Sequence, residues 1–409
     1  MGRRDSAVLD SLFSIGGVLA QGLSRFAYTA LVGRLLGAEA LAAVNVGFAV
    51  SILLSLLWPT AAGNAAAAFA RRDRPQTRRA LQRSVLLSLV PLCIGAGAVA
   101  AVLGGTPAAI AQAAALTAAW SGYIFARGVF IGAGRVRSAA VWDVVTGVLA
   151  ICLLLVFIAQ RWEQILLVPA VVGYGVFALA AALSVGRAER GADAADAPVA
   201  TRAFVFWNSL ALIATNGLMQ ASMVAASALD TPSAAGQFAA ALSLATPVSM
   251  VAQAVTQAML PRFGQWLELP AHETTRAVRR ASAALAAVMA AGTGCVALVL
   301  PLALPLIYGD RYAPAVPLAQ ALMVAVFGFS LSVFFAAYLA TVGRAREATA
   351  LAGIGSAVGV GAMIVVGASA GGSIGAVVGT GAGMLLSLVL LAAAALRHRP
   401  RPGAAHGGG

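Results

Sequence analysis

The sequence is poor in charged residues and has no lysine. Of its 409 residues only 10% are charged, all 27 basic residues are arginine, and there are 14 acids, 3 histidines and 3 cysteines. The few acids and histidines show no metal-ligand spacing and no catalytic constellation, so we expect no metal and no cofactor, and an enzyme is the class least favoured. Cys93, Cys152 and Cys295 are too scattered for a disulfide, and we expect them to serve as small apolar residues in the core.

Apolar residues make up most of the chain. They account for 61% of it and the mean hydropathy is +0.90, which excludes a soluble globule. Because lipid leaves no backbone group unpaired, each run of about 20 apolar residues must be a helix, so the fold class is an all-α integral membrane protein. We predict twelve transmembrane helices, over 9-33, 41-69, 84-103, 107-130, 138-159, 164-186, 203-228, 235-260, 281-307, 314-341, 347-367 and 373-396.

The arginines indicate the orientation. Of the 27, all but Arg25, Arg34, Arg161 and Arg311 fall at the N-terminus, in alternate loops or in the C-terminal tail. The positive-inside rule then puts both termini in the cytoplasm and accounts for the net charge of +13 without nucleic acid. Arginine without lysine, in an alanine-rich chain, is typical of a bacterium with GC-rich DNA, so we expect a multi-pass protein of the bacterial cytoplasmic (inner) membrane.

The composition changes once, at a polar stretch from Gly186 to Arg202. We therefore predict an N-terminal six-helix lobe over 1-186, a cytoplasmic linker over 187-202, a C-terminal six-helix lobe over 203-396 and a disordered cytoplasmic tail over 397-409.

The two halves resemble each other faintly. Leu36-Gly37-Ala38-Glu39 aligns with Leu229-Asp230-Thr231-Pro232, and two arginine-containing loops align with offsets of 197 and 209: 79-83 with 276-280, and 134-137 with 343-346. Chance and the positive-inside rule could produce part of this match. As a repeat, it predicts two bundles related by a pseudo-two-fold axis along the membrane normal, which can rock about a central cleft in alternating access.

The first predicted helix carries an arginine within the membrane. An arginine at that depth costs about 2.5 to 3.5 kcal/mol unless it snorkels or faces a polar interior. Ser14, Gln21, Arg25 and Tyr28 fall within about 60° of one another on a helical wheel, which favours a polar lining. We predict that Gln21, Arg25 and Tyr28 bind substrate, Arg25 at an anionic group.

The seventh and eighth predicted helices carry amides instead of charge. Ser209, Asn216, Gln220 and Ser227 form a stripe about 40° wide, and Gln253 and Gln257 follow on the next helix. An offset of 193 puts Leu218 opposite Arg25, so only the first half has a charge at this depth. We predict Asn216, Gln220, Gln253 and Gln257 as substrate-binding residues; single amides can also simply join neighbouring helices.

Asp143 is the only acid well inside a predicted span. A membrane carboxylate is a candidate for coupling to a proton or sodium gradient, but its shallow depth favours a salt bridge to a nearby arginine. Arg127, at the inner end of its helix, is interpreted as a topology determinant. We also expect helix breaks at Trp58-Pro59 and at four further prolines: Pro91, Pro247, Pro301 and Pro305.

Two stretches, Leu31-Val-Gly-Arg34-Leu-Leu-Gly37-Ala-Glu39 and Leu306-Ile-Tyr308-Gly-Asp-Arg-Tyr312-Ala-Pro314-Ala-Val-Pro317, together with the basic loop after Ala70, carry a family resemblance. The chain resembles polysaccharide exporters and O-antigen-type (Wzx-like) flippases of the multidrug/oligosaccharidyl-lipid/polysaccharide (MOP) superfamily. The resemblance implies two six-helix lobes and a cationic cavity. It also implies flipping of a polyprenyl-pyrophosphate-linked oligosaccharide to the outer leaflet for polysaccharide biosynthesis.

Four alternatives follow. The leading hypothesis is a flippase whose partners are the lipid-linked saccharide, membrane lipids and a polysaccharide polymerase or glycosyltransferases. The second is a MATE-like small-molecule exporter, and the third is a membrane scaffold for glycosyltransferases. A lipid II flippase is disfavoured because the chain lacks two further C-terminal helices and most of the expected cavity charges.

Overall fold

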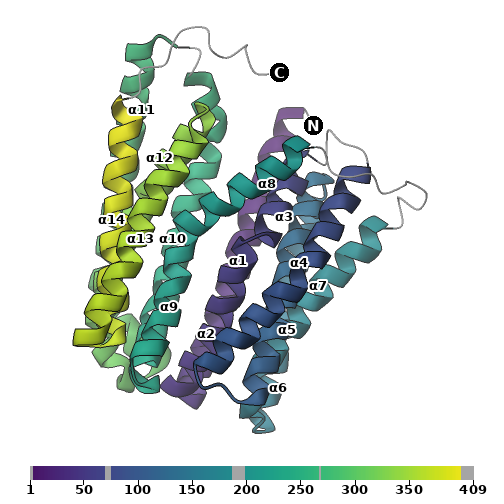
Figure 1. The fold of residues 1–409 in the computed structure, drawn as a ribbon, viewed down its shortest axis with the longest axis vertical. Helices are drawn as coiled ribbons and strands as arrows, with labels where there is room; N and C mark the ends of the chain where they lie inside the picture. The colour runs from purple at the N-terminus through teal and green to yellow at the C-terminus, as the bar shows by residue number, and fades with distance from the viewer. Residues whose placement is uncertain (1–2, 70–74, 187–198, 267–268, 398–409) are drawn as a thin grey trace. The chain divides into compact units, whose positions relative to one another are not determined.

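The computed structural model describes residues 3–69, 75–186, 199–266 and 269–397, and the described part is helical without strands (Figure 1). The longer elements run in the following order: α1 Arg3–Leu36, α2 Ala38–Leu56, α3 Pro59–Phe69, α4 Pro75–Val102, α5 Pro107–Gly132, α6 Val136–Ala159, α7 Val168–Gly186, α8 Val199–Leu212, α9 Leu218–Leu229, α10 Pro232–Trp266, α11 Ala271–Tyr308, α12 Val316–Thr341, α13 Ala345–Ala370 and α14 Gly372–Arg397. Short 3-10 turns lie at Glu163–Ile165 and Asp310–Ala315, and a π-helix joins α8 to α9 at Ile213–Gly217.

The all-α membrane fold class is confirmed. Ten helices of the described chain are long and apolar enough to cross a membrane, and Val168–Ser184 is a shorter apolar helix. The predicted spans 9-33 and 164-186 correspond to α1 and α7, which are not among those ten. The protein is therefore a multi-pass membrane protein, and twelve crossings remain a prediction.

The predicted helix breaks are only partly correct. The chain does break at Trp58-Pro59, where α2 gives way to α3. At the other four prolines the helix is not interrupted, since α4 continues through Pro91, α10 through Pro247, and α11 through Pro301 and Pro305, and the kinks expected there stay a prediction. Neighbouring groups can satisfy the carbonyl that a proline leaves free in a membrane helix, so the helix continues.

The chain divides into two compact units, Met1–Ile213 and Ala214–Gly409. The division falls inside the π-helix of the seventh predicted span, so α8 belongs to the first unit. Most of the predicted linker and nearly all of the predicted tail, at 187–198 and 398–409, lie outside the described residues.

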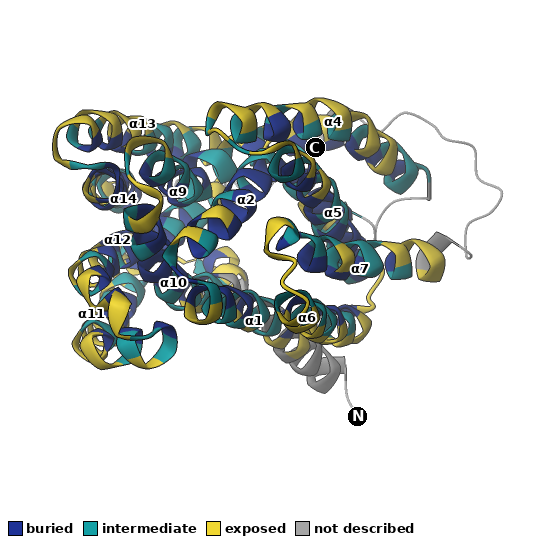
Figure 2. Cartoon of the chain, turned by 90° about the horizontal axis from the view of Figure 1, so that it is seen from below, coloured by how far each residue is buried: buried dark blue, intermediate teal, exposed yellow. Residues whose placement is uncertain are grey.

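The helices pack in a similar order within each unit. In the first unit, α1 packs against α2 and α6, while α5 packs against α2, α3, α4 and α7. In the second unit, α9 packs against α10 and α13 and, unlike α1, also against the last helix, α14, while α12 packs against α10, α11 and α14. Figure 2 shows that buried residues line these inner faces. The fourth predicted span of each half, α5 or α12, is thus the centre of its unit.

Two matching turns strengthen the repeat. Gly134 and Gly343 have φ of 72° and 82°, a left-handed conformation that glycine adopts without strain. The following arginines donate matching backbone hydrogen bonds, Arg135 N to Phe130 O at 2.8 Å and Arg344 N to Leu339 O at 2.8 Å. The aligned Gly-x-x-Arg loops therefore end their helices by the same C-cap geometry.

Large apolar side chains on the outer helix faces are exposed, as expected for surfaces that meet lipid. The cysteines depart from the prediction, because Cys152 and Cys295 are exposed and Cys93 is half-buried. A helix in lipid can carry small apolar residues on its outer face at no hydrophobic cost, so hydropathy does not separate the outer face from the core.

Candidate functional site

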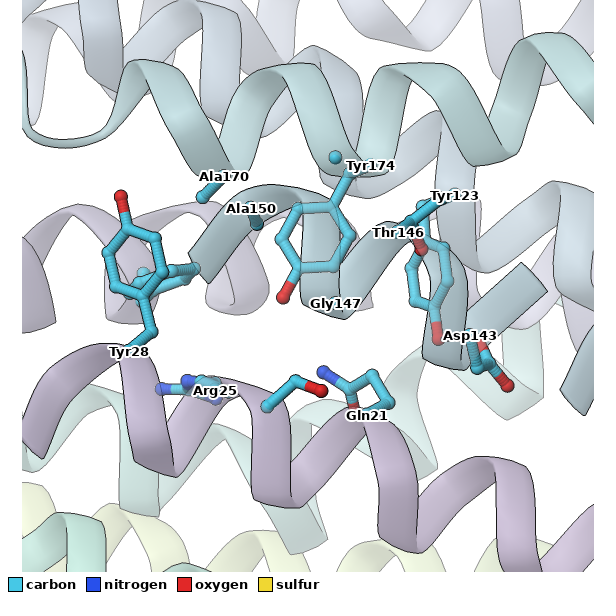
Figure 3. A pocket seen from close by; sticks show the side chains of 13 residues that line it. Gln21, Arg25, Tyr28, Tyr123, Asp143, Thr146, Gly147, Ala150, Ala170 and Tyr174 are labelled. Atoms are coloured by element: carbon cyan, nitrogen blue, oxygen red, sulfur yellow. Dashed lines mark hydrogen bonds between the residues drawn. The ribbon is translucent and has the colours of Figure 1, made fainter. Parts of the chain in front are cut away.

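A polar pocket lies inside the first unit, between α1, α6 and α7 (Figure 3). It contains four of the predicted site residues, Gln21, Arg25, Tyr28 and Asp143, which the structure brings together. The other lining residues are Ser24, Phe48, Tyr123, Thr146, Gly147, Ala150, Ala170, Gly173 and Tyr174. Every one of them belongs to the first unit, so this pocket is built without the second.

Two close helix approaches hold α1 against α6. A Cβ added to Gly17 would lie 2.7 Å from Asp143 Oδ2, and one added to Gly147 would lie 2.3 Å from Ser24 Oγ. Neither position has room for a larger side chain. Glycine on one helix and a polar side chain on the other therefore set the distance between the two pocket walls.

Arg25 is the main charge on the α1 wall. Its guanidinium carbon lies 5.0 Å from the centroid of the Phe48 ring, in a cation–π contact. Within the described chain no ion pair joins Arg25 to a carboxylate. The cation–π contact is worth about 0.5 to 2 kcal/mol, which only partly offsets the cost of about 2.5 to 3.5 kcal/mol for an arginine in the membrane.

Asp143 is already neutralised. Arg127 Nε donates to Asp143 Oδ2 at 3.0 Å, and the Tyr123 hydroxyl donates to Oδ1 at 2.7 Å. The Asp143 side chain is fully buried and that of Arg127 is 13% exposed. The expected salt bridge to a nearby arginine is confirmed, with Arg127 as the partner, and the interpretation of Arg127 as a topology determinant stays a prediction. Together with Arg25, this part of the unit holds two guanidiniums and one carboxylate, which leaves one positive charge in excess.

Tyrosine hydroxyls and an amide complete the polar lining. The Tyr174 hydroxyl points toward α1, between Gln21 and Arg25 (Figure 3). The buried Gln21 Nε2 faces that hydroxyl at a geometry outside that of a regular hydrogen bond. The Tyr123 and Tyr174 rings pack with centroids 5.0 Å apart, which fixes both hydroxyls. The lining therefore offers hydrogen-bond donors beside an excess positive charge.

Tyr28 has a structural role. Its hydroxyl donates to the Leu166 carbonyl just before α7, and its ring meets Phe48 edge-on with centroids 5.9 Å apart. The side chain is only 2% exposed. Tyr28 thus joins α1 to the start of α7 and supports the ring beneath Arg25.

The free space among these side chains is small, about 20 Å³. That volume holds one water-sized group, since a water needs about 10 to 15 Å³ of such space. The pocket in this conformation is therefore closed to anything as large as a sugar or a phosphate ester.

None of the amides predicted in the second half is among the residues that line this pocket. Gln220 and Gln253 are half-buried, and the Gln257 side chain lies outside the described residues. Asn216 lies in the π-helix and donates from Nδ2 to Thr215 Oγ1 at 3.0 Å. A π turn acts as an inserted residue and rotates the following helix by about 100°, so the wheel that aligned Ser209 with the later residues does not carry across it.

Sequence reasoning missed Tyr123, Tyr174 and Phe48 as part of the site. An aromatic residue in a membrane helix is usually core or interface, and nothing in the local sequence marks these three. A usable signal was Asp143 itself, because a buried carboxylate needs hydrogen-bond donors and the preceding helix offers Tyr123 and Arg127 four residues apart on one face.

The fold matches solved transporters over nearly the whole chain. One is an inward-facing multidrug resistance MATE family transporter of the MOP superfamily, with a TM-score of 0.69, 16% identity and coverage of 92% of this chain and 94% of that one. A second is the eukaryotic MATE transporter AtDTX14, with a TM-score of 0.64, 12% identity and coverage of 96% of both chains. A third is a MOP superfamily transporter from Pyrococcus furiosus, with a TM-score of 0.59, 17% identity and coverage of 95% of both chains. That protein is described as having a binding pocket of reverse polarity, which suggests a different function for it.

No protein-family model and no curated protein sequence matches the chain. At such low identities the structural similarity establishes the fold alone. The polarity of the site must therefore decide among functions.

Proposed function

We infer that the protein is a membrane transporter that moves an amphiphile with an anionic headgroup, and that its cargo is a lipid-linked oligosaccharide carried to the outer leaflet. The observation that carries this proposal is the half-buried Arg25 guanidinium, which lines the pocket without a carboxylate partner in the described chain. A phosphate or pyrophosphate would supply the missing negative charge through charge-assisted hydrogen bonds.

Pocket polarity favours an anion over a cation. A cationic drug would need a carboxylate, and Asp143 is already held by Arg127 and Tyr123. It would also be repelled by Arg25 in surroundings of low dielectric. Asp143 remains a candidate for coupling to a proton or sodium gradient, in which case its charge state would control the grip on Arg127.

The fold supports transport by alternating access. The MATE transporters with which the chain shares its fold include both inward-facing and outward-facing structures. The space beside Arg25, about 20 Å³, does not admit a phosphate ester. In the proposed cycle α1 moves away from α6 and α7 to expose Arg25 to the headgroup, while the lipid tail stays in the bilayer.

The second candidate is a small-molecule exporter. The observation that favours it is the whole-chain match to multidrug transporters. Under this proposal Arg25 would select anionic compounds, and a lipid tail would not be needed.

The test is transport by the purified protein in proteoliposomes. The probes are a fluorescent polyprenyl-pyrophosphate-linked oligosaccharide, a fluorescent organic anion without a lipid tail, and the cation ethidium. We expect movement of the lipid-linked probe alone, reduced at least tenfold by Arg25→Gln, because a hydrogen bond to a charged group is worth about 1.5 to 3 kcal/mol. The matched control is Arg34→Gln, which changes an exposed arginine of the same helix.

Two other outcomes would change or contradict this proposal. Transport of the free anion with the same dependence on Arg25 would replace the flippase by the exporter. Transport of ethidium, or lipid-linked transport that Arg25→Gln leaves unchanged, would contradict the role assigned to the pocket.

A further inference from the structure

A second cavity of the first unit lies between α4 and α7 and is independent of the Arg25 pocket. Its free volume is about 260 Å³, against about 20 Å³ beside Arg25. Both α4 and α7 pack on α5, and Figure 2 shows α5 between them, so α5 forms the floor of a groove. Most of the lining is apolar, with Val85, Leu86 and Leu89 on the α4 side and Phe125 and Val129 on the floor.

The groove lies among surfaces that meet lipid. Leu86 and Leu87 on α4 are 57% and 67% exposed, and Leu179 on α7 is 59% exposed. Exposed leucines of this kind are expected only where hydrocarbon surrounds the helix. The groove therefore opens toward the bilayer, and its natural occupant is an alkyl chain.

One end of the groove is cationic. Arg78 and Gln82 line it one helical turn apart on α4, ahead of the leucines. Arg135 donates from Nη1 to the Ser184 carbonyl at 3.1 Å, two residues past the lining residue Ala182 of α7. No Asp or Glu occurs in α4, α5 or α7 as the structure describes them. This end thus complements an anionic headgroup.

We propose that this groove binds an anionic phospholipid of the leaflet that faces the arginine-rich loops, with its phosphate at Arg78 and one acyl chain along α5 between α4 and α7. Basic pockets between helices on the cytoplasmic side are established features of phospholipid recognition, and Arg pairs with phosphate through two parallel N–H bonds. A chain in the groove would fill space that the two outer helices leave open.

The experiment counts lipids bound to the detergent-purified, full-length protein by native mass spectrometry. The probes are dioleoyl-phosphatidylglycerol and dioleoyl-phosphatidylcholine, which share their acyl chains and differ in charge. We expect the first bound lipid to be phosphatidylglycerol by about fivefold, and Arg78→Gln to remove that preference, since one basic residue near the surface changes affinity by about this factor. Ala182→Phe, which blocks the groove and keeps the charge, should reduce binding of both lipids.

The matched control is Arg83→Gln, an exposed arginine of α4 that does not line the groove. It should keep the preference. Equal loss in Arg78→Gln and Arg83→Gln would mean general surface charge and overturn the site, as would equal binding of the two lipids by the wild type. Tighter binding of polyprenyl phosphate than of phosphatidylglycerol would assign the groove to the cargo lipid and overturn the phospholipid. A thermal unfolding scan of each variant confirms that it is folded.

Discussion

The two units differ at one aligned position, which is Arg25 in the first unit and Leu218 in the second. In the first, Arg25 lines a polar pocket between α1, α6 and α7. In the second, the aligned Leu218 is 2% exposed and fills the corresponding space between α9, α13 and α14. A Cβ added to Gly383 or Gly359 would come within 2.6 Å or 2.9 Å of the Leu218 side chain.

The second charge differs in the same way. The offset of 209 that aligns the Gly134 and Gly343 turns puts Ala352, which is 1% exposed, opposite Asp143. At these aligned positions the first unit thus has a charged interior and the second an apolar, glycine-lined one. This difference in polarity is the reason for placing the candidate site in the first unit.

The largest effect should come from moving the charge into the second unit. Leu218→Arg would bury a guanidinium against glycine backbone. The second unit has Ala352 at the position of Asp143, so no carboxylate there could pair with the new charge. An unpaired buried ion costs several kcal/mol, so we expect loss of folded protein after membrane extraction, measured by size-exclusion chromatography. Leu218→Met, which conserves volume, should stay monodisperse. A folded Leu218→Arg variant would contradict the distinction between the two interiors.

The next effect should come from breaking the ion pair of the first unit. Asp143→Ala removes the carboxylate that the half-buried Arg127 binds, at a cost of up to about 3 to 5 kcal/mol, and should lower the midpoint of thermal unfolding. The double variant Asp143→Leu with Arg127→Leu makes this position resemble the second unit and should recover most of the loss. If the single and double variants unfold alike, the pair does not account for the stability of this site.

A smaller effect should follow from filling the tight helix contact of the second unit. A Cβ at Gly375 on α14 would lie 2.5 Å from the Gly367 backbone on α13, so Gly375→Ala should cost about 1 to 3 kcal/mol. Gly381→Ala on the same helix meets nothing within 4 Å and should be neutral or stabilising by up to about 1 kcal/mol. Thermal unfolding of the two variants measures the difference, and equal midpoints would show that α13 and α14 are less closely packed than described.

The smallest effect concerns pH and the end of the second unit. Burial acts to raise the pKa of Asp230, but hydrogen bonds from Ser373 and from the Thr231 backbone outweigh it, and the net pKa is lowered. One of these is the Ser373 N–H at the start of α14, at 2.9 Å. A lowered pKa stabilises the fold above the unfolded value of about 3.9 and loses that contribution as pH falls through the folded value.

Asp230→Asn should therefore lower the free energy of unfolding at pH 7 by about 0.5 to 1 kcal/mol, as the loss of a helix cap does. The difference between variant and wild type should become smaller below about pH 4, where Asp230 is increasingly protonated. Melting curves at pH 7, 5 and 3.5 provide the measurement. A difference that does not change with pH would show that the charge of Asp230 is not involved.

Hydropathy and arginine placement were enough to predict the helices, because lipid permits only helical backbone. The Gly134 and Gly343 loops were also predictable, since glycine after a long helix marks its C-cap. The π-helix at Ile213–Gly217 and the continuous helices through Pro91 and Pro301 were not. Both features depend on which neighbouring groups hydrogen-bond to a carbonyl that the helix leaves free. In the π-helix, for example, Ser356 Oγ donates to the Ala214 carbonyl at 2.5 Å from 142 residues away in the sequence.

The sequence predicted which face of the first helix carries the polar site residues, but not which helices pack against that face. Gln21, four residues before Arg25, predicted an arginine on an interior face, and both residues line the described pocket. The helical wheel does not show which helix lies opposite, so the expected cleft between the halves remains a prediction while the described pocket lies within one unit. Likewise, the depth of Asp143 indicated an arginine partner, and only the packing of α5 on α6 identified it as Arg127.

The most direct test of the central claim is headgroup selectivity in proteoliposomes. It compares transport of a lipid-linked oligosaccharide bearing pyrophosphate with that of the same glycan on a neutral lipid, for the wild type and for Arg25→Leu, which copies the second unit. The account predicts that the wild type prefers the charged cargo at least tenfold and that Arg25→Leu brings the ratio close to one. An unchanged ratio in a folded Arg25→Leu variant would contradict it.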